Sequence, residues 1–289
     1  RFPSHDACLD CLKERFHPNG SDCPSCGKAT KFHRIKSRAA YSCQYCRHQV
    51  YPTAGTIFHK STTNLQMWFW GIFLMSSTRC GISAKQLERE IGVSYPTAHR
   101  MFKQIRTLLS QDADAPLTGK VEVDETAGGA KHARAGDAKR GLAFVKKSQR
   151  PTIWGAVERG GRVRAKVIDS RATLDVEPPL FEHVLPSSMV FTDDWRGYDP
   201  KRVGTHFMGH HRIKHLQKVY VDGDVHTQTI EGFFGLLKNG IRGVYHSVST
   251  TYLQSYLDEY AWRYNHRDDS RPMFWSILDR VGKEAPDAS

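Results

Sequence analysis

The hydrophobic and polar positions of the chain predict helices in its first part and strands in its middle. In residues 82–109 the apolar side chains recur at helical spacing on both sides of Gly92, where the chain can turn, and Ser94 can cap the second helix. The polar side of this second helix carries Thr97, His99, Arg100, Lys103 and Arg106. Two helices in this arrangement, the second of them basic, are typical of a helix-turn-helix that enters the major groove of DNA, although plain helical hairpins share the pattern.

The most apolar run lies just before this region. "MWFWGIFLM", residues 67–75, has nine residues without a charge, whereas a membrane span needs about 20 apolar residues. We therefore expect a buried helix here, a buried side chain at the lone Cys80, and no membrane partner. The chain begins at Arg1 without the pattern of a signal peptide, and we expect a cytoplasmic protein.

The middle of the chain has the two-residue alternation of β-strands. Residues 120–126, "KVEVDET", predict a half-buried strand with Glu122 and Asp124 on one face and valines on the other. Residues 152–169 predict a hairpin of two β-rich runs joined at a Gly-Gly pair. The remaining predicted elements are a short helix at 178–186, a fourth strand at 187–195 that ends in two aspartates, and helices from His226 onward.

This order of elements, with Glu231 on a late helix, is the order of an RNase H-like domain, an α/β fold in which helices flank a mixed sheet. In that fold, carboxylates from the first strand, the fourth strand and the late helix converge on two Mg²⁺ ions. Hard cations need oxygen ligands, and a pair of them can activate an attacking hydroxyl and stabilise a leaving oxygen in phosphodiester displacement.

The cysteines predict a second, smaller domain. Six of the seven precede residue 47, and the pairs Cys23/Cys26 and Cys43/Cys46 have the spacing of a zinc ribbon, in which four thiolates bind one structural Zn²⁺. Cys8 and Cys11 lie on an amphipathic helix and can be core residues or ligands. Thiolate ligands and free thiols require a reducing compartment. We expect a zinc ribbon with a short N-terminal helix at 1–58, a helix-turn-helix region at 59–112 and an RNase H-like domain at 119–280.

The charge of the chain favours a polyanionic partner. The formal net charge is +12, which by itself can also serve solubility alone. Residues 131–150 hold seven basic side chains against one acid, with almost no hydrophobic periodicity, and predict a basic loop along DNA phosphates. The loop residues that we expect to bind DNA are Lys139, Arg140, Lys146 and Lys147.

Motifs along nearly the whole chain resemble one family. "CPSCG", "CQYCR", "GTIF", "VEVDET", "TDDWRGY" and "HTQTIEGFFGLLKNGIRGVYH" are similar to those of bacterial insertion-sequence DDE transposases with an N-terminal zinc ribbon and a helix-turn-helix, the ISXO-type group. The resemblance implies a catalytic triad of Asp124, Asp193 and Glu231 that binds Mg²⁺ or Mn²⁺. It also implies a functional lysine after the glutamate, Lys238. Glu231 and Lys238 are two helical turns apart and share a face, so we expect Glu231 to reach the metal and Lys238 the DNA backbone beside it.

The resemblance also implies an activity and partners. The ribbon and the helix-turn-helix would bind the terminal inverted repeats of an insertion sequence in double-stranded DNA. The catalytic domain would free a 3′-hydroxyl by hydrolysis and direct its attack on target DNA. Two ends must be paired, so we expect a homo-oligomer on DNA, in the cytoplasm at the nucleoid.

Some alternatives stay open at this point. Four further acids compete for the metal site: Glu122, which shares a strand face with Asp124, Asp194, which alternates away from Asp193, and Asp222 and Asp224, which lie in a turn-like "VDGDVH". Two other functions fit the motifs, a DNA-binding protein without catalytic activity and an RNase H-like nuclease that acts on branched or hybrid nucleic acid.

Overall fold

A computed structural model of the chain shows two compact units. The structure describes residues 2–78, 80–110, 115–128, 151–193, 197–213, 226–246 and 248–282. Unit 1 comprises Arg1–Thr78, Ile82–Leu108 and Arg271–Ser289, and unit 2 comprises Arg79–Gly81 and Leu109–Ser270. The chain therefore returns to its first unit after it has completed the second.

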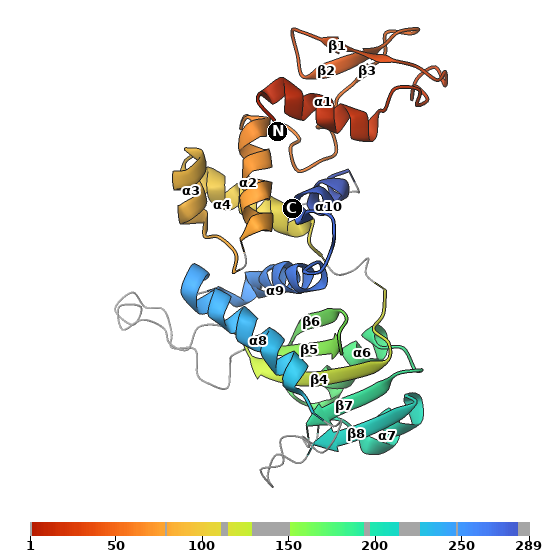
Figure 1. Cartoon of the computed structure of the whole chain (residues 1–289), viewed down its shortest axis with the longest axis vertical. Helices are drawn as coiled ribbons and strands as arrows, with labels where there is room; N and C mark the ends of the chain where they lie inside the picture. Colours follow the sequence, from red (N-terminus) through yellow and green to blue (C-terminus); the bar gives the residue numbers. More distant parts are fainter. Residues whose placement is uncertain are drawn as a thin grey trace. The chain divides into compact units, whose positions relative to one another are not determined.

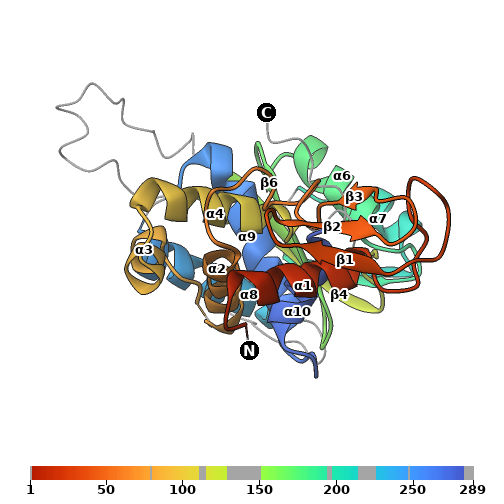
Figure 2. The same ribbon diagram turned by 90° about the horizontal axis from the view of Figure 1, so that it is seen from above.

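Unit 1 begins with a helix and a small antiparallel sheet. Its elements are α1 (His5–Phe16), β1 (Phe32–Ile35), β2 (Ala40–Cys43) and β3 (Gln49–Val50), and the strands are in the order β1-β2-β3. Helix α1 starts at Ser4, whose hydroxyl accepts from Ala7 N at 3.1 Å. It lies alongside the sheet (Figures 1 and 2), where Arg34 Nη2 donates to Asp6 Oδ1 at 2.9 Å and Tyr41 donates to Asp10.

Four helices form the rest of unit 1. They are α2 (Leu65–Ser77), α3 (Ala84–Ile91), α4 (Tyr95–Thr107) and α10 (Met273–Arg280). The expected turn lies at Gly92, whose φ of 71° ends α3. Ser94 is the N-cap residue of α4, but its hydroxyl bonds to Thr97 Oγ1 at 3.0 Å and not to the helix backbone. The predicted domain boundaries remain predictions, and α10 groups with unit 1 because Phe274 packs against Phe69 of α2, with ring centroids 5.9 Å apart.

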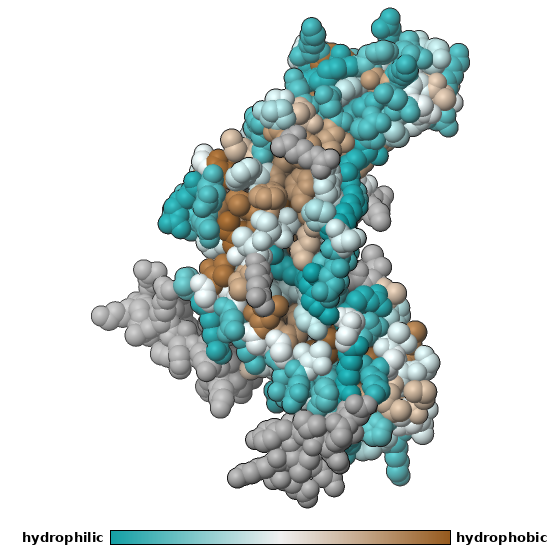
Figure 3. All heavy atoms as spheres, viewed as in Figure 1, coloured by the Kyte–Doolittle hydropathy of each residue, from teal (hydrophilic) through white to brown (hydrophobic). Residues whose placement is uncertain are grey.

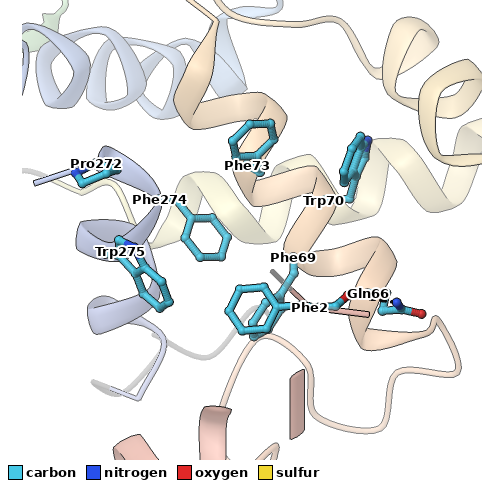
Figure 4. A pocket seen from close by; sticks show the side chains of 8 residues that line it. All are labelled: Phe2, Gln66, Phe69, Trp70, Phe73, Pro272, Phe274 and Trp275. Atoms are coloured by element: carbon cyan, nitrogen blue, oxygen red, sulfur yellow. Dashed lines mark hydrogen bonds between the residues drawn. The ribbon is translucent and has the colours of Figure 1, made fainter. Parts of the chain in front are cut away.

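Helix α2 corrects the expectation of a buried helix. Its inner face is buried, but Trp70 and Phe73 keep 51% and 47% of their surface exposed. Hydrophobic side chains gather over this helix at the surface (Figure 3). Together with residues of α10 and Phe2, they line a hollow of about 570 Å³ (Figure 4). A nine-residue run is too apolar for one helix face to bury it all, because successive residues point around the whole circumference.

Unit 2 is built on a mixed five-stranded sheet. Its elements are β4 (Lys120–Ala127), β5 (Thr152–Glu158), β6 (Val163–Ile168), α6 (Thr173–His183), β7 (Met189–Asp193), α7 (Pro200–His206), β8 (Gly209–Ile213), α8 (Gln228–Gly240), the π-helical turn η3 (Ile241–Tyr245) and α9 (Thr250–Asn265). The strand order is β6-β5-β4-β7-β8 (Figure 1). Pairs β4–β5 and β5–β6 are antiparallel, whereas β4–β7 and β7–β8 are parallel. This topology confirms the expected RNase H-like α/β fold.

Apolar side chains cover both faces of this sheet. On one face, Ile153 and Val157 of β5 pack with Phe233 and Leu237 of α8. On the other face, the odd-numbered valines of β4 pack with residues of α6 and α7. Strand β4 lies in the centre of the sheet, so even Glu122 is fully buried, and the expectation of a half-buried strand was wrong.

In the part of the chain that the structure describes, no helix combines the length and the apolar character that a membrane crossing requires.

Candidate active site and zinc centre

Two matching turns present the cysteines of the ribbon. Gly27 N donates to Cys23 O at 2.9 Å, and Arg47 N donates to Cys43 O at 3.1 Å. Gly27 and Arg47 have φ values of 67° and 63°, in the left-handed region. Each lies directly after the second cysteine of its pair, so the two Cys-x-x-Cys sequences form equivalent turns.

The four sulfur atoms form a cluster of the size that zinc requires. The Sγ atoms of Cys23, Cys26, Cys43 and Cys46 all lie within 4.8 Å of one another. Cys23 Sγ is 3.6 Å from Cys46 Sγ, and Cys26 Sγ is 3.9 Å from Cys43 Sγ. Zn–S bonds of about 2.3 Å place the sulfurs of a tetrahedral site roughly 3.8 Å apart. The cluster therefore supports the predicted structural zinc.

Hydrogen bonds prepare two of these sulfurs for metal binding. Burial acts to raise the pKa of Cys43, but hydrogen bonds from the Thr30 hydroxyl and from the backbone N–H groups of Cys46 and Tyr45 lower that pKa to about 6. The backbone N–H of Cys26 lowers the pKa of Cys23. Because zinc binds the thiolate and not the thiol, these donors favour the metal-binding form.

The other cysteines lie outside this cluster. Cys8 is buried in α1, and burial raises its pKa to about 11, so it is a protonated core thiol. Among the described residues, the group that could hold a metal contains neither Cys8 nor Cys11, which favours the core alternative for this pair. Cys80 is exposed, contrary to expectation, because it follows the end of α2 in a connecting turn.

The carboxylates predicted as metal ligands lie on neighbouring elements of unit 2. Val123 of β4 is paired with Thr192 of the parallel strand β7, so Asp124 and Asp193 follow at the same level. Strand alternation directs both side chains to the face that α8 covers. Glu231 lies in the first turn of α8.

A glycine allows α8 to approach the sheet beside Asp124. Gly155 of β5 is the antiparallel partner of Asp124. A Cβ atom at Gly155 would lie 2.8 Å from Phe234 Cζ and 3.0 Å from Ile230 Cδ1, both on α8. Only glycine therefore permits this close packing, which brings the helix that carries Glu231 next to Asp124.

Burial and neighbouring charges raise the pKa of Asp124. Burial is the largest cause that raises this pKa to about 6, and the negative charges of Asp193 and Glu231 raise it further. The backbone N–H of Glu125, 2.7 Å from Asp124 Oδ1, and the charge of Arg171 act in the opposite direction. A divalent cation bound by such carboxylates would reduce the repulsion between them.

The raised pKa of Asp124, which burial causes first and neighbouring charges second, predicts a stability effect of Asp124→Asn. The folded-state pKa of Asp124 is raised from 3.8 to about 6, so ionisation destabilises the fold as the pH rises through this interval. Without added Mg²⁺ or Mn²⁺, we expect the variant to be more stable than wild type at neutral pH by roughly 1–3 kcal/mol. The difference should vanish below about pH 3, where the carboxyl is protonated in both states.

Urea unfolding of both proteins across this pH range measures the difference. Asparagine can still accept the hydrogen bond from Glu125 N, so the substitution removes the charge and little else. A variant that is less stable than wild type at neutral pH would contradict the electrostatic account of Asp124.

A second buried pair, Glu125 and Tyr198, was not predicted from the sequence. Glu125 points to the opposite face from Asp124 and accepts a hydrogen bond from the Tyr198 hydroxyl. Burial raises the pKa of Glu125 to about 7. Arg171 Nη2 donates to Glu125 O at 3.0 Å, so this segment of β4 is held from that side. The signal was present in "VDET" and "TDDWRGY", which bring both residues close to predicted metal ligands in the sequence.

Lys238 lies two turns after Glu231 on α8. Its Nζ is 5.9 Å from the centre of the Phe234 ring, and the side chain is half-buried. Phe233, Phe234 and Leu237 are buried and Leu236 is partly buried, but Phe234 lies on the same side of the helix as Lys238 and not on the remaining side, where it was expected. A role for Lys238 at the DNA backbone stays a prediction.

The residues predicted to bind DNA on α4 have different surroundings. His99, Arg100 and Lys103 are exposed, and Thr97 is half-buried. Arg100 lies over the ring of Trp68, 5.8 Å from its centre. Arg106, which the sequence placed on the polar side, is buried at 5% exposure because the last turn of α4 is enclosed within the unit. Lys103 is exposed on α4 and is therefore a suitable position for a binding test.

Some predicted residues lie outside the described part of the chain. They are Lys139, Arg140, Lys146 and Lys147 of the basic loop and the rival acids Asp194, Asp222 and Asp224. The remaining rival, Glu122, lies within the described residues and accepts hydrogen bonds from backbone N–H groups at the start of α8.

Comparison with known proteins identifies similar sequences for both units. Residues 116–265, more than half of the chain, match the family model of the ISXO2-like transposase domain. Residues 3–49 match the model of the transposase zinc-ribbon domain. A protein of Halobacterium salinarum, described as an uncharacterized protein in transposable element ISH50, is 30% identical over 255 residues, which cover 82% of this chain and 84% of that protein. The matched ranges include the four-cysteine cluster and Asp124, Asp193 and Glu231.

Proposed function

The chain belongs to the ISXO2-like transposase family, and from this premise we propose that it binds the ends of an insertion sequence and cuts and joins DNA strands there. The observation that carries the proposal is the placement of Asp124 and Asp193 at one level on adjacent strands, with Glu231 in the first turn of the helix that packs beside Asp124. Carboxylates held close together repel one another unless a cation neutralises them, so this arrangement favours the binding of a divalent cation.

The proposed chemistry assigns a role to each carboxylate. Asp124 and Asp193 project from rigid strands and would hold Mg²⁺ or Mn²⁺ in place, while Glu231 would complete the ligand set from the helix. When bound, a pair of these ions supplies activation of the attacking hydroxyl and stabilisation of the leaving oxygen in phosphodiester displacement. Ionised Asp124 is the form that binds a cation, so at metal concentrations below saturation activity should fall as the pH drops below about 6.

A cleavage assay tests this proposal. A labelled duplex that carries the DNA flanking the gene is incubated with the protein and Mg²⁺ or Mn²⁺. We expect nicks at the boundary of the inverted repeat, and no nicks without the divalent ion. Cleavage of branched or hybrid substrates in preference to this duplex would favour an RNase H-like nuclease instead.

The helix-turn-helix and the ribbon would recognise the DNA ends. We propose that α4 lies in the major groove and presents Thr97, His99, Arg100 and Lys103, with the basic loop along the phosphates. The exposure of three of these side chains on one helix supports this proposal. The net charge of +12 would add a sequence-independent attraction.

Lys103→Ala tests the position of α4. We expect the variant to bind the terminal repeat about 1 kcal/mol more weakly than wild type. The slope of log Kd against log salt concentration should be smaller by about one, because one phosphate contact is lost. The measurement is fluorescence anisotropy over a range of salt concentrations. Arg89→Ala, which removes an exposed cation from α3, is the matched control, and an equal loss in both variants would argue against α4 as the recognition helix.

The assembly on DNA follows from the same proposal. Two ends of one element must be cut and joined in a single complex, so we predict that at least two copies of the chain assemble on paired ends. Light scattering with and without end DNA measures this. A monomer in both conditions would contradict the predicted homo-oligomer.

A further inference from the structure

We propose that Glu122 is a positioning residue of the active site, which holds the first turn of α8 on β4 and thereby sets Glu231 beside Asp124. The inference rests on the proposed function, since it relates Glu122 to these two carboxylates. Strand alternation alone would have placed Glu122 among the metal ligands, because it shares a face with Asp124.

The start of α8 is capped from a different element. Its N-cap residue, Thr227, makes no side-chain cap hydrogen bond. Instead, Glu122 Oε2 accepts from Thr229 N at 2.8 Å and from Ile230 N at 3.2 Å. These are the second and third residues of the helix, whose N–H groups an N-cap side chain normally satisfies. A carboxylate of β4 thus replaces the local cap, and its charge suits the positive end of the helix dipole.

Further donors enclose the same carboxylate. Glu122 Oε1 accepts from Arg159 Nε at 2.7 Å and from Thr229 Oγ1 at 3.0 Å, and His226 Nδ1 lies 3.1 Å away. Arg159 also donates to His226 O at 2.9 Å and lies 4.3 Å from the centre of the Phe191 ring. Because Glu122 has no exposed surface, its charge depends on these partners, which also fix the residue that leads into α8.

The position of this cap relates it to the proposed ligands. Glu122 and Asp124 are two residues apart on one strand, a separation of about 7 Å along it. Ile230, whose N–H is bound by Glu122, is followed directly by Glu231. The contacts of the Glu122 side chain therefore fix the position of Glu231 relative to Asp124.

Apolar packing alone would leave this relation loose. Ile230 and Phe234 lie against Gly155, which sets how closely α8 approaches the sheet. Such packing has no preferred direction along the helix axis, whereas hydrogen bonds to the Glu122 carboxylate require particular directions and distances. Metal ligands must be held within about 0.5 Å of their working geometry, so the directional contact is the one that the site needs.

The test compares Glu122→Gln with a matched control in the full-length chain. Glutamine has the same shape, but its NH2 group replaces one of the two oxygens and so faces either the donors on Oε1 (Arg159 and the Thr229 hydroxyl) or the helix N–H groups on Oε2. The control is Glu177→Gln, since Glu177 is also buried, accepts from Asp199 N at 3.0 Å and pairs with Arg202 at 2.9 Å, on the opposite face of the sheet. Mn²⁺ is titrated into each protein and followed by electron paramagnetic resonance, and amide exchange of Thr229 and Ile230 is measured without it.

We expect Glu122→Gln to bind Mn²⁺ roughly 10- to 100-fold more weakly than wild type, with faster exchange at Thr229 and Ile230. Glu177→Gln should match wild type in both measurements. A merely structural role would instead lower the melting temperature of both variants and leave the Mn²⁺ titration unchanged. Unchanged Mn²⁺ binding in a folded Glu122→Gln protein would overturn the inference.

Two further variants separate the possible failures. Asp124→Asn should lose the Mn²⁺ site, and a titration identical to wild type would overturn the proposed metal site itself, together with any positioning role relative to it. If Glu122→Gln does not fold, Thr229→Val removes only the hydroxyl that donates to Glu122 and keeps the backbone N–H. It should weaken Mn²⁺ binding by up to roughly tenfold, and an unchanged titration would then overturn the inference.

Discussion

Asp124→Asn and Asp193→Asn should each reduce strand cleavage by roughly 10³-fold or more while DNA binding is retained. Each substitution replaces an anionic oxygen that a hard divalent cation requires with a neutral amide. Both residues lie on adjacent strands at one level, so loss of either should disable the same site. Cleavage of end DNA in single-turnover conditions and anisotropy with the same duplex measure the two properties separately.

The buried pair on the other face of β4 provides the control for this prediction. Glu125→Gln removes an acid next to Asp124 in the sequence, but its side chain accepts from Tyr198 on the opposite side of the sheet. We expect a smaller loss of cleavage than for either aspartate. Equal activity of wild type and both aspartate variants would show that cleavage, if present, does not depend on this site.

Removal of the zinc ligands should have the second large effect. The double variant Cys43→Ser/Cys46→Ser leaves two of four thiolates, and structural zinc in small sites contributes about 10–16 kcal/mol of apparent folding free energy. We therefore expect the ribbon to lose its zinc and its fold, and the protein to bind end DNA much more weakly. Zinc content and limited proteolysis between residues 20 and 50 report these changes.

A second cysteine variant controls for the loss of thiols in general. Cys80→Ser removes an exposed cysteine outside the cluster and should keep the zinc content of wild type. Wild type should contain one zinc per chain, because Cys8 and Cys11 do not belong to the described cluster. Two zinc ions per chain, or full zinc retention in the double variant, would contradict the assignment of the four ligands.

The sequence predicted those features that depend on local spacing. The zinc ribbon was visible because each Cys-x-x-Cys pair forms its own turn, in which the residue after the second cysteine takes a left-handed conformation. The hairpin of β5 and β6 and the turn at Gly92 were visible for the same reason, since glycine marks both turns. The order of the predicted strands and helices of the RNase H-like domain was enough to predict its mixed sheet.

Other features depend on partners distant in the sequence and could not be predicted. Glu122 was read as a possible metal ligand because alternation gives a face but not the contact on that face, which here is the start of α8. Arg106 was read as polar surface, although the end of α4 is enclosed. The grouping of α10 with unit 1 depends on ring contacts between Phe274 and Phe69, more than 200 residues apart.

At the candidate active site, some features follow from the local sequence and others from tertiary packing. Asp124 could be proposed from its place on one face of an alternating strand and Asp193 from a strand ending, both together with the family resemblance, and strand register places them side by side. The raised pKa values of Asp124 and Glu125 arise from burial, which only the folded structure provides. Sequence therefore suggested the acids, and tertiary packing determines their electrostatics.

Strand transfer by wild type and Glu231→Gln is the most direct test of the central claim that these carboxylates catalyse metal-dependent joining of DNA. The substrate is a labelled duplex copied from the DNA that flanks the gene, incubated with target DNA and Mg²⁺ or Mn²⁺. We predict that wild type nicks at the repeat boundary and joins the end to target DNA, while Glu231→Gln only binds. Equal binding by both proteins with no cleavage by either would contradict the catalytic claim and favour a DNA-binding protein without activity.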